Sequence, residues 1–155
     1  MAKEDLKDRT KKFAIRVIKL ANALPKTPEG NVIRYQLIKS GTSTAANYRA
    51  SCRARSILEF IAKLGIVEEE ADESAFWMEV IIERKLLKEE LVRPLSQEAN
   101  EILAIVVTSQ KTARISKKIK IINSKFVIQN SSFSNLDIYR HYVYNNFTIY
   151  IIKTI

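Results

Sequence analysis

The stretch from Ser40 to Glu73 places the strongest constraint on the fold, because it contains two helical segments of opposite charge separated by one break. Its first part, SGTSTAANY, consists of small residues, which let a neighbouring helix approach closely. Three arginines follow, and after the break apolar residues recur at helical spacing around the acidic run EEEADE. We therefore expect a helical hairpin with a small-residue face, a basic turn and an acidic second arm.

Start and stop signals divide residues 1–116 into four helices. Thr27-Pro28 is a typical helix start, Ser56 and Glu59 have the spacing of a capping box, and Pro94 suits a first turn. The expected helices are about 4–24, 28–54, 56–87 and 94–116, with a charged connector at 88–93. Apolar residues spaced by three and four along each predict one buried face. This pattern predicts an all-α, up-down-up-down four-helix bundle.

The composition changes after Ser116. Residues 117–155 are rich in Ile, Asn, Lys, Tyr and Ser and contain no Ala or Gly. The residue types that are frequent here are those that A/T-rich codons encode. We interpret them as an atypical tail outside the bundle, such as a lost stop codon would add. Such a tail is expected to be disordered, and the alternative is a weak β-hairpin on the bundle, which the β-branched and aromatic content of 118–129 and 138–152 would suit.

Charge is unevenly distributed along the chain. Residues 1–55 carry 13 Lys and Arg against 4 acids, residues 56–101 carry 5 against 12, and residues 102–155 carry 8 against 1. A basic face of this kind suits a polyanion, whereas pairing between the basic and acidic blocks is the alternative. The candidate nucleic-acid-binding residues are Arg49, Arg53, Arg55, Lys63, Lys12, Arg16 and Lys19.

The sequence offers little catalytic chemistry. The single histidine, His141, lies in the tail, and one cysteine, Cys52, has no partner that favours a thiolate, so we expect it to pack inertly. No catalytic triad, glycine-rich phosphate loop or Glu-x-x-His metal motif occurs in the bundle. The acidic run at 68–73 is a weak candidate for Mg²⁺, because consecutive helical acids point in different directions. We expect no enzyme activity, cofactor or metal.

The N-terminal residues are charged and lack the apolar core of a signal peptide. A single cysteine excludes an internal disulfide and suits a reducing cytoplasm. No apolar run approaches the length of roughly 18 residues that a membrane span needs. These features predict a cytoplasmic protein without a membrane partner.

The run SGTSTAANYRASCRARS, followed by EFIAKLGIVEEEADESAFW, resembles the 23S rRNA intervening-sequence (S23) family of four-helix bundles. The similarity covers about residues 8–115. The resemblance implies a ring-like homopentamer in a bacterial cell, and a related group, the accessory proteins of diversity-generating retroelements, is thought to bind nucleic acid through a basic surface. It implies no catalytic residues. The tail after residue 116 departs from the family pattern.

These observations favour a non-enzymatic, oligomeric protein that binds RNA or DNA. The apolar surface of the second helix and a lone tryptophan on the flank of the third predict subunit contacts at Tyr48 and Trp77. A protein-interaction scaffold, in which the basic and acidic blocks meet only each other, is the alternative function. A metal-dependent nuclease is a third, weaker one.

Overall fold

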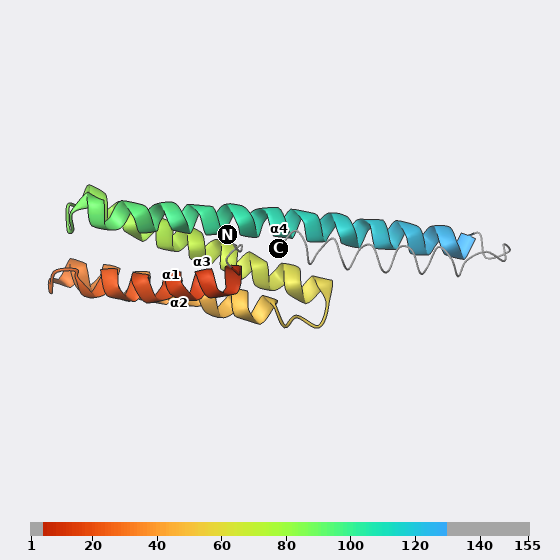
Figure 1. Cartoon of the computed structure of the whole chain (residues 1–155), viewed down its shortest axis with the longest axis horizontal. Helices are drawn as coiled ribbons and strands as arrows, with labels where there is room; N and C mark the ends of the chain where they lie inside the picture. The colour runs from red at the N-terminus through yellow and green to blue at the C-terminus, as the bar shows by residue number, and fades with distance from the viewer. Residues whose placement is uncertain (1–4, 130–155) are drawn as a thin grey trace. The chain divides into compact units, whose positions relative to one another are not determined.

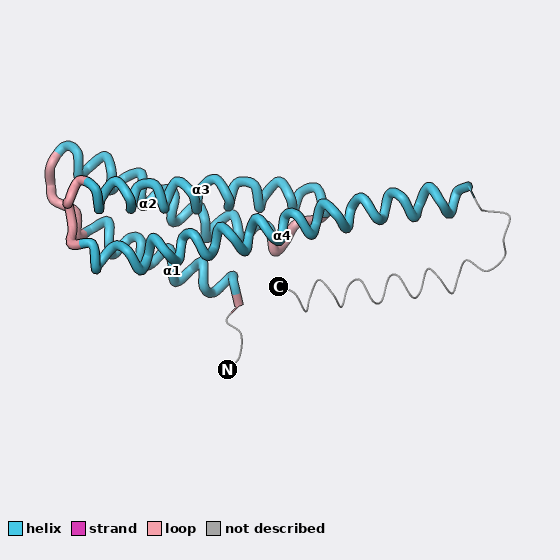
Figure 2. Tube along the Cα trace, turned by 90° about the horizontal axis from the view of Figure 1, so that it is seen from above, coloured by secondary structure: helices cyan, strands magenta, loops and turns pink. Residues whose placement is uncertain are grey.

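The computed structural model describes residues 5–129, and all regular structure within that range is helical. Its four helices are α1 (Leu6–Asn22), α2 (Pro28–Ser51), α3 (Ile57–Glu83) and α4 (Glu89–Gln129). The chain divides into two compact units, Met1–Lys111 and Thr112–Ile155. In the first unit, α1, α2, α3 and the start of α4 pack side by side (Figures 1 and 2). The predicted all-α four-helix bundle is confirmed.

Side chains cap the first three helices where the sequence places a short acceptor. Asp5, Thr27 and Ser56 each occupy an N-cap in extended backbone and accept from a backbone N–H at 3.1 Å. The reciprocal half of the predicted capping box is shifted by one residue. The Glu59 carboxylate accepts from the backbone N–H of Arg55 at 2.9 Å, instead of that of Ser56.

The fourth helix begins earlier than predicted. Residues 89–93 are its first turns rather than a charged connector, and Pro94 lies inside the helix. Glu89 and Glu90 occupy the first turn, where acidic side chains favour the positive end of the helix dipole. Pro94 stands close enough to the helix start that its missing N–H removes only an early hydrogen bond.

The fourth helix also continues beyond the predicted end at Ser116. It reaches Gln129, so the strand prediction for residues 118–129 is wrong. Propagating a helix that is already nucleated is easier than starting one, and the helical penalty of isoleucine is well under 1 kcal/mol per residue. The tail prediction for 130–155, including the second strand and His141, lies outside the described residues.

The core of the bundle draws on all four helices. Its largest fully buried side chains are Phe13, Leu37, Leu64, Met78, Ile81 and Ile102. The predicted apolar stripes of α1, α3 and α4 supply most of these positions, and Thr10, which interrupts the α1 stripe in the sequence, is buried with them. Helix periodicity therefore identified the core.

The small-residue face of α2 brings its neighbours close on two sides. A Cβ added to Gly41 would stand 2.5 Å from Cγ1 of Val17 on α1, well inside van der Waals contact. On the α3 side, the buried hydroxyl of Ser74 donates to that of Ser40 at 2.9 Å. Thr44 donates to the backbone carbonyl of Ser40 at 2.9 Å, so these buried hydroxyls are satisfied.

Arg34 closes the C-terminal end of α1 from its position on α2. Its guanidinium donates to the backbone carbonyl oxygens of Ala21 at 3.2 Å and Leu24 at 2.6 Å. These carbonyls belong to the end of a helix, where acceptors lack intrahelical partners and the dipole favours a cation. One side chain thus joins the α1–α2 connection to the second helix.

Within residues 5–129, every helix is too short or too polar to cross a bilayer.

Replacing Gly41 by alanine should destabilise the bundle. The added methyl group overpacks against Val17, at a cost of about 1–3 kcal/mol that exceeds the gain in helix propensity of about 1 kcal/mol. Gly65→Ala is the matched control, because an added Cβ there meets only the Gln110 side chain at 4.0 Å. Urea unfolding should show Gly41→Ala less stable and Gly65→Ala slightly more stable than wild type. Equal behaviour of both variants would contradict close packing at Gly41.

Arg34→Met should lower the free energy of unfolding by about 1.5–3 kcal/mol, because carbonyls at the end of α1 lose a charged donor. Methionine keeps most of the apolar stem, so packing changes little. Arg34→Lys should fall between the two, since an ammonium group cannot reach several carbonyls at once. Thermal or urea unfolding measures the order of stability of the three proteins. An Arg34→Lys variant that is less stable than Arg34→Met would refute the capping role.

Candidate nucleic-acid interface

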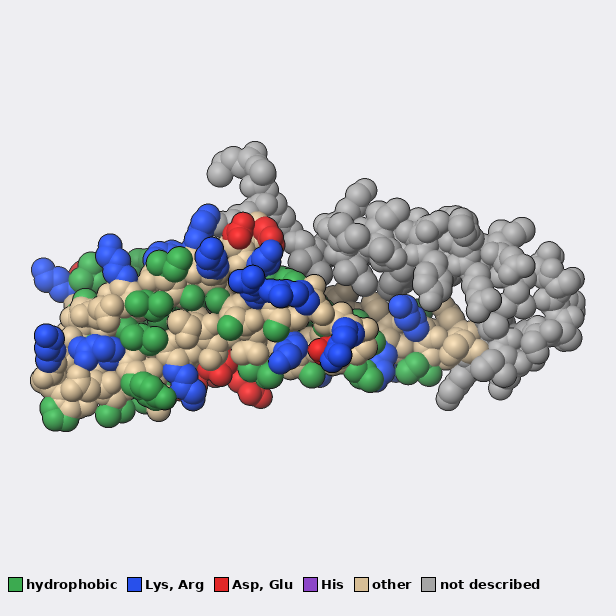
Figure 3. Space-filling view, turned by 90° about the horizontal axis from the view of Figure 1, so that it is seen from below, with side chains coloured by type: hydrophobic (Ala, Val, Ile, Leu, Met, Phe, Trp, Pro, Cys, Tyr) green, Lys and Arg blue, Asp and Glu red, His purple; other side chains and the backbone are tan. Residues whose placement is uncertain are grey.

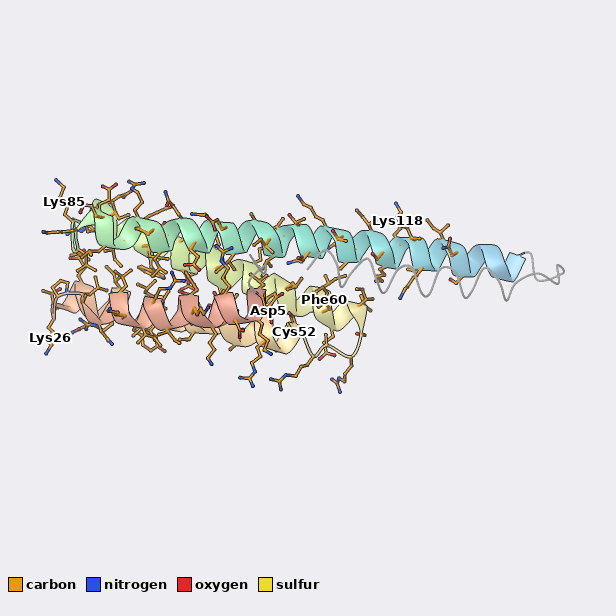
Figure 4. All side chains as sticks on the ribbon, viewed as in Figure 1. Asp5, Lys26, Cys52, Phe60, Lys85 and Lys118 are labelled. Carbon is orange, nitrogen blue, oxygen red and sulfur yellow. The ribbon has the colours of Figure 1, made fainter. Side chains whose placement is uncertain are left out.

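Four of the predicted basic residues gather where α2 turns into α3, and we call Arg49, Arg53, Arg55 and Lys63 the basic tip. Cys52 caps α2 at this end of the bundle, and Phe60 follows in the first turns of α3 (Figure 4). The C-terminal end of a helix carries partial negative charge, which stabilises cations such as Arg49 and Arg53. The end of α2 therefore favours the two arginines that lie there.

Arg49 and Arg53 are exposed, and neither forms an ion pair with any residue that the structure describes. They lie four residues apart, at the last turn of α2 and just beyond it. Their spacing places both on one side of the helix end. These two guanidinium groups have their donors available for an external anion.

Arg55 and Lys63 both interact with an acidic side chain of the same chain. The guanidinium of Arg55 contacts the Glu59 carboxylate at 3.3 Å, although the Arg55 side chain is 89% exposed. The backbone N–H of Arg55, followed by its side chain, lowers the pKa of Glu59. Lys63 is half-buried and adds a weaker attraction to the same carboxylate. Glu59 therefore offsets part of the positive charge at the tip.

The predicted basic residues of α1, Lys12, Arg16 and Lys19, form a separate stripe. They recur at spacings of four and three, so they share one side of the helix. Arg16 contacts Glu98 of α4 at 2.5 Å, whereas Lys12 and Lys19 are exposed. These three residues therefore do not belong to the tip, and Arg16 is paired with a residue of a neighbouring helix.

Arg9 extends the α1 stripe and contacts two acidic residues of α4, one of which also contacts Arg16. Its guanidinium contacts Glu98 at 3.5 Å and bonds to Glu101, and the bond to Glu101 is the main cause that raises the pKa of Arg9. Sequence reasoning did not single out Arg9, Glu98 or Glu101. They could have been found from the two acids, which lie three residues apart on the fourth helix, beside its apolar stripe.

Figure 3 looks onto the face that α1 and α2 form. On this face blue Lys and Arg side chains are widespread, red acidic side chains are few, and hydrophobic side chains lie between them. The acids of the second charge block lie mainly on α3 and α4. The two charge blocks predicted from the sequence thus belong to different helices, and salt bridges of Arg9, Arg16, Arg55 and Arg84 join them.

The two predicted subunit contacts differ in their placement. Tyr48 is buried within the single chain, and this burial raises the pKa of its phenol, so little of its ring is left for a partner. Trp77 is half-buried, donates its indole N–H to Glu73 at 3.1 Å and meets Phe76 edge-on at 5.0 Å between ring centroids. The interface role of both residues stays a prediction.

Cys52 was expected to pack inertly. The packing part of that prediction is wrong, and the inertness of the thiol stays a prediction. The thiol belongs to an exposed residue at the α2 C-cap, beyond the end of the buried helical face.

Side chains of the acidic run of α3 interact with other residues of the bundle. Glu68 accepts from the buried Gln110 side chain at 2.7 Å, and Glu73 accepts from Trp77. Glu70 faces Ser43 and Lys39 of α2, and desolvation, followed by repulsion from Glu73, raises its pKa. Within the described residues, no three acidic, histidine or cysteine side chains converge on a metal position.

The fold and the site define an antiparallel four-helix bundle with an exposed basic tip at one helical connection. The chain matches the family described as 23S rRNA-intervening sequence protein over residues 3–108, and it belongs to that family. It is 31% identical to a crystallised protein of unknown function from the S23 ribosomal protein family of Bacteroides thetaiotaomicron. That match has a TM-score of 0.65 and covers 69% of this chain and 99% of the other. No curated protein matches the chain.

Glu70→Gln should raise the thermal midpoint at neutral pH. The folded state raises the pKa of Glu70, so its ionised form destabilises the fold, and stability should increase as pH falls through the folded value. Glutamine removes the charge and retains the shape. The difference between variant and wild type should vanish at a pH low enough to protonate Glu70 in both states. A variant that is less stable at neutral pH would contradict the desolvation argument.

Proposed function

We propose that the protein is a non-enzymatic, homopentameric bundle that binds RNA or DNA through its basic tip. The observation that carries the proposal is the pair Arg49 and Arg53, both exposed and without an ion pair among the described residues. Guanidinium groups are effective phosphate ligands because their donors match two phosphate oxygens at once. Contacts of this kind position a nucleic acid without reading its sequence.

Repetition of the tip strengthens this proposal. A single phosphate contact is weak and screened by salt, whereas several tips on one assembly can engage one strand together. A closed ring would repeat Arg49 and Arg53 around its axis. The family description, which refers to 23S rRNA intervening sequences, makes single-stranded and structured RNA the first probes.

The rival function is a protein-interaction scaffold. It requires the basic residues to meet acids of the same protein, and Arg9 and Arg16 do so on α4. Among the described residues, the tip follows that pattern in the salt bridge between Arg55 and Glu59. The two proposed functions therefore differ in the partner that they assign to Arg49 and Arg53. Nucleic-acid binding assigns them phosphate groups, whereas the scaffold assigns them acidic residues of another subunit.

Arg49→Glu combined with Arg53→Glu should weaken binding to RNA and DNA of every sequence tested. Fluorescence anisotropy between about 50 and 200 mM salt should give a straight log–log plot for the wild type, with a slope near 0.9 per phosphate contacted. The double variant should lose about two units of slope for each tip engaged. Circular dichroism should show unchanged helical content, because both side chains are exposed.

Lys26→Glu combined with Lys88→Glu is the matched control. It changes the net charge equally, at the end of the bundle opposite the tip, where Lys26 and Lys85 are labelled in Figure 4. This control should bind nearly as well as the wild type. Light scattering on all three proteins completes the test. Altered assembly of the tip variant with unchanged nucleic-acid affinity would favour the scaffold, and no wild-type binding at low salt would refute the proposal.

A further inference from the structure

The C-terminal part of α4, residues 112–124, carries an exposed apolar stripe. Ile115, Ile119 and Ile122 are 60%, 39% and 54% exposed. They are spaced by four and three residues, so in the helix that the structure shows they lie on one side. The stripe exists only because this segment is helical, since as a strand these residues would alternate between two faces. It also lies beyond the part of the chain that matches the family, residues 3–108.

The same segment is strongly basic. It contains Lys117, Lys118 and Lys120 together with Arg114, and the sequence has no acidic residue between Glu101 and Asp137. Lys118 and Lys120 are exposed and Lys117 is half-buried. Within such an acid-free stretch, the three lysines have no acidic neighbour on their own helix segment.

Helical geometry relates the charge to the stripe. At 100° per residue, Lys117 and Lys120 lie on the side away from the isoleucines, and Lys118 borders them. Ile121, which is 45% exposed, falls outside the stripe, on the basic side. Lysine stems beside an apolar face can extend their ammonium groups towards a charged layer above it. The arrangement is that of a basic amphipathic helix.

We propose that residues 112–124 form a docking surface for an anionic lipid membrane, on which the helix lies with its isoleucine stripe inserted at the headgroup boundary. Such a surface satisfies both features, because the acyl region takes the stripe and acidic headgroups take the lysines. A second copy of the segment would bring like charges together. A nucleic acid would neutralise the lysines and leave the isoleucines in water.

This inference differs from the prediction of no membrane partner, which rested on the absence of a long apolar run. A helix that lies in the interface needs no such run, because only one side of it enters the bilayer. The same helix is compatible with the finding that no described helix can cross a membrane. The inference is also independent of nucleic-acid binding at the tip, which involves other residues.

Flotation of the full chain with vesicles tests the inference. The wild type should float with phosphatidylcholine vesicles that contain phosphatidylglycerol, and at least about tenfold less with phosphatidylcholine alone. Ile115→Gln, Ile119→Gln and Ile122→Gln together should reduce flotation by at least about tenfold, since glutamine keeps helix propensity and charge but removes the stripe. Lys117→Gln, Lys118→Gln and Lys120→Gln together should reduce it on the order of a hundredfold.

Ile15→Gln combined with Ile18→Gln is the matched control, because these α1 isoleucines are also exposed. It should float like the wild type, and all variants should keep the helical content and the nucleic-acid affinity of the wild type. Failure of the wild type to float with anionic vesicles would overturn the inference. So would full flotation of the isoleucine triple variant, which would leave charge alone as the cause, or an equal loss in the α1 control.

Discussion

Close packing along α2 is the constraint on which the rest of the bundle depends. Gly41 lets Val17 of α1 approach to a distance that no Cβ would allow, and Ser40 on the adjoining side shares a buried hydrogen bond with Ser74 of α3. A larger residue at either place would separate α2 from a neighbour. Because interiors are packed as densely as crystals, such a separation would spread to the apolar layers that α4 completes.

The same arrangement explains why charge accumulates at the tip. A helix whose sides are taken up by two neighbours directs its polar residues outward and to its ends. In α2 this leaves Arg49 and Arg53 at the C-terminal end, where the helix dipole favours them and no described acid meets them. The α1 basic residues face another environment, because Glu98 on α4 stands within reach of Arg16.

The exposed arginines of the described residues fall into two groups, those with an acidic partner within the chain and those without one. Pairs such as Arg16 with Glu98 link helices of one bundle, and partly exposed pairs of this kind contribute little stability each. Arg49 and Arg53 form no ion pair with a described residue, and they are the residues that we propose to bind an external anion. On α4, Lys117, Lys118 and Lys120 occur together with an isoleucine stripe, whereas the tip has no comparable stripe. For this reason we propose a lipid membrane as the partner of the α4 segment and a nucleic acid as the partner of the tip.

The sequence by itself determined the helical class, the caps at Thr27 and Ser56 and most of the core, because helix periodicity and capping are local properties. It failed where local preference competes with context: Ile-rich residues 118–129 favour strands in isolation but continue a helix that is already formed. Only the tertiary structure decided which arginines have partners. The pairing of Arg16 with Glu98, and the lack of an ion pair between Arg49 and any described residue, depend on contacts between helices distant in sequence, which no spacing rule along one helix reveals.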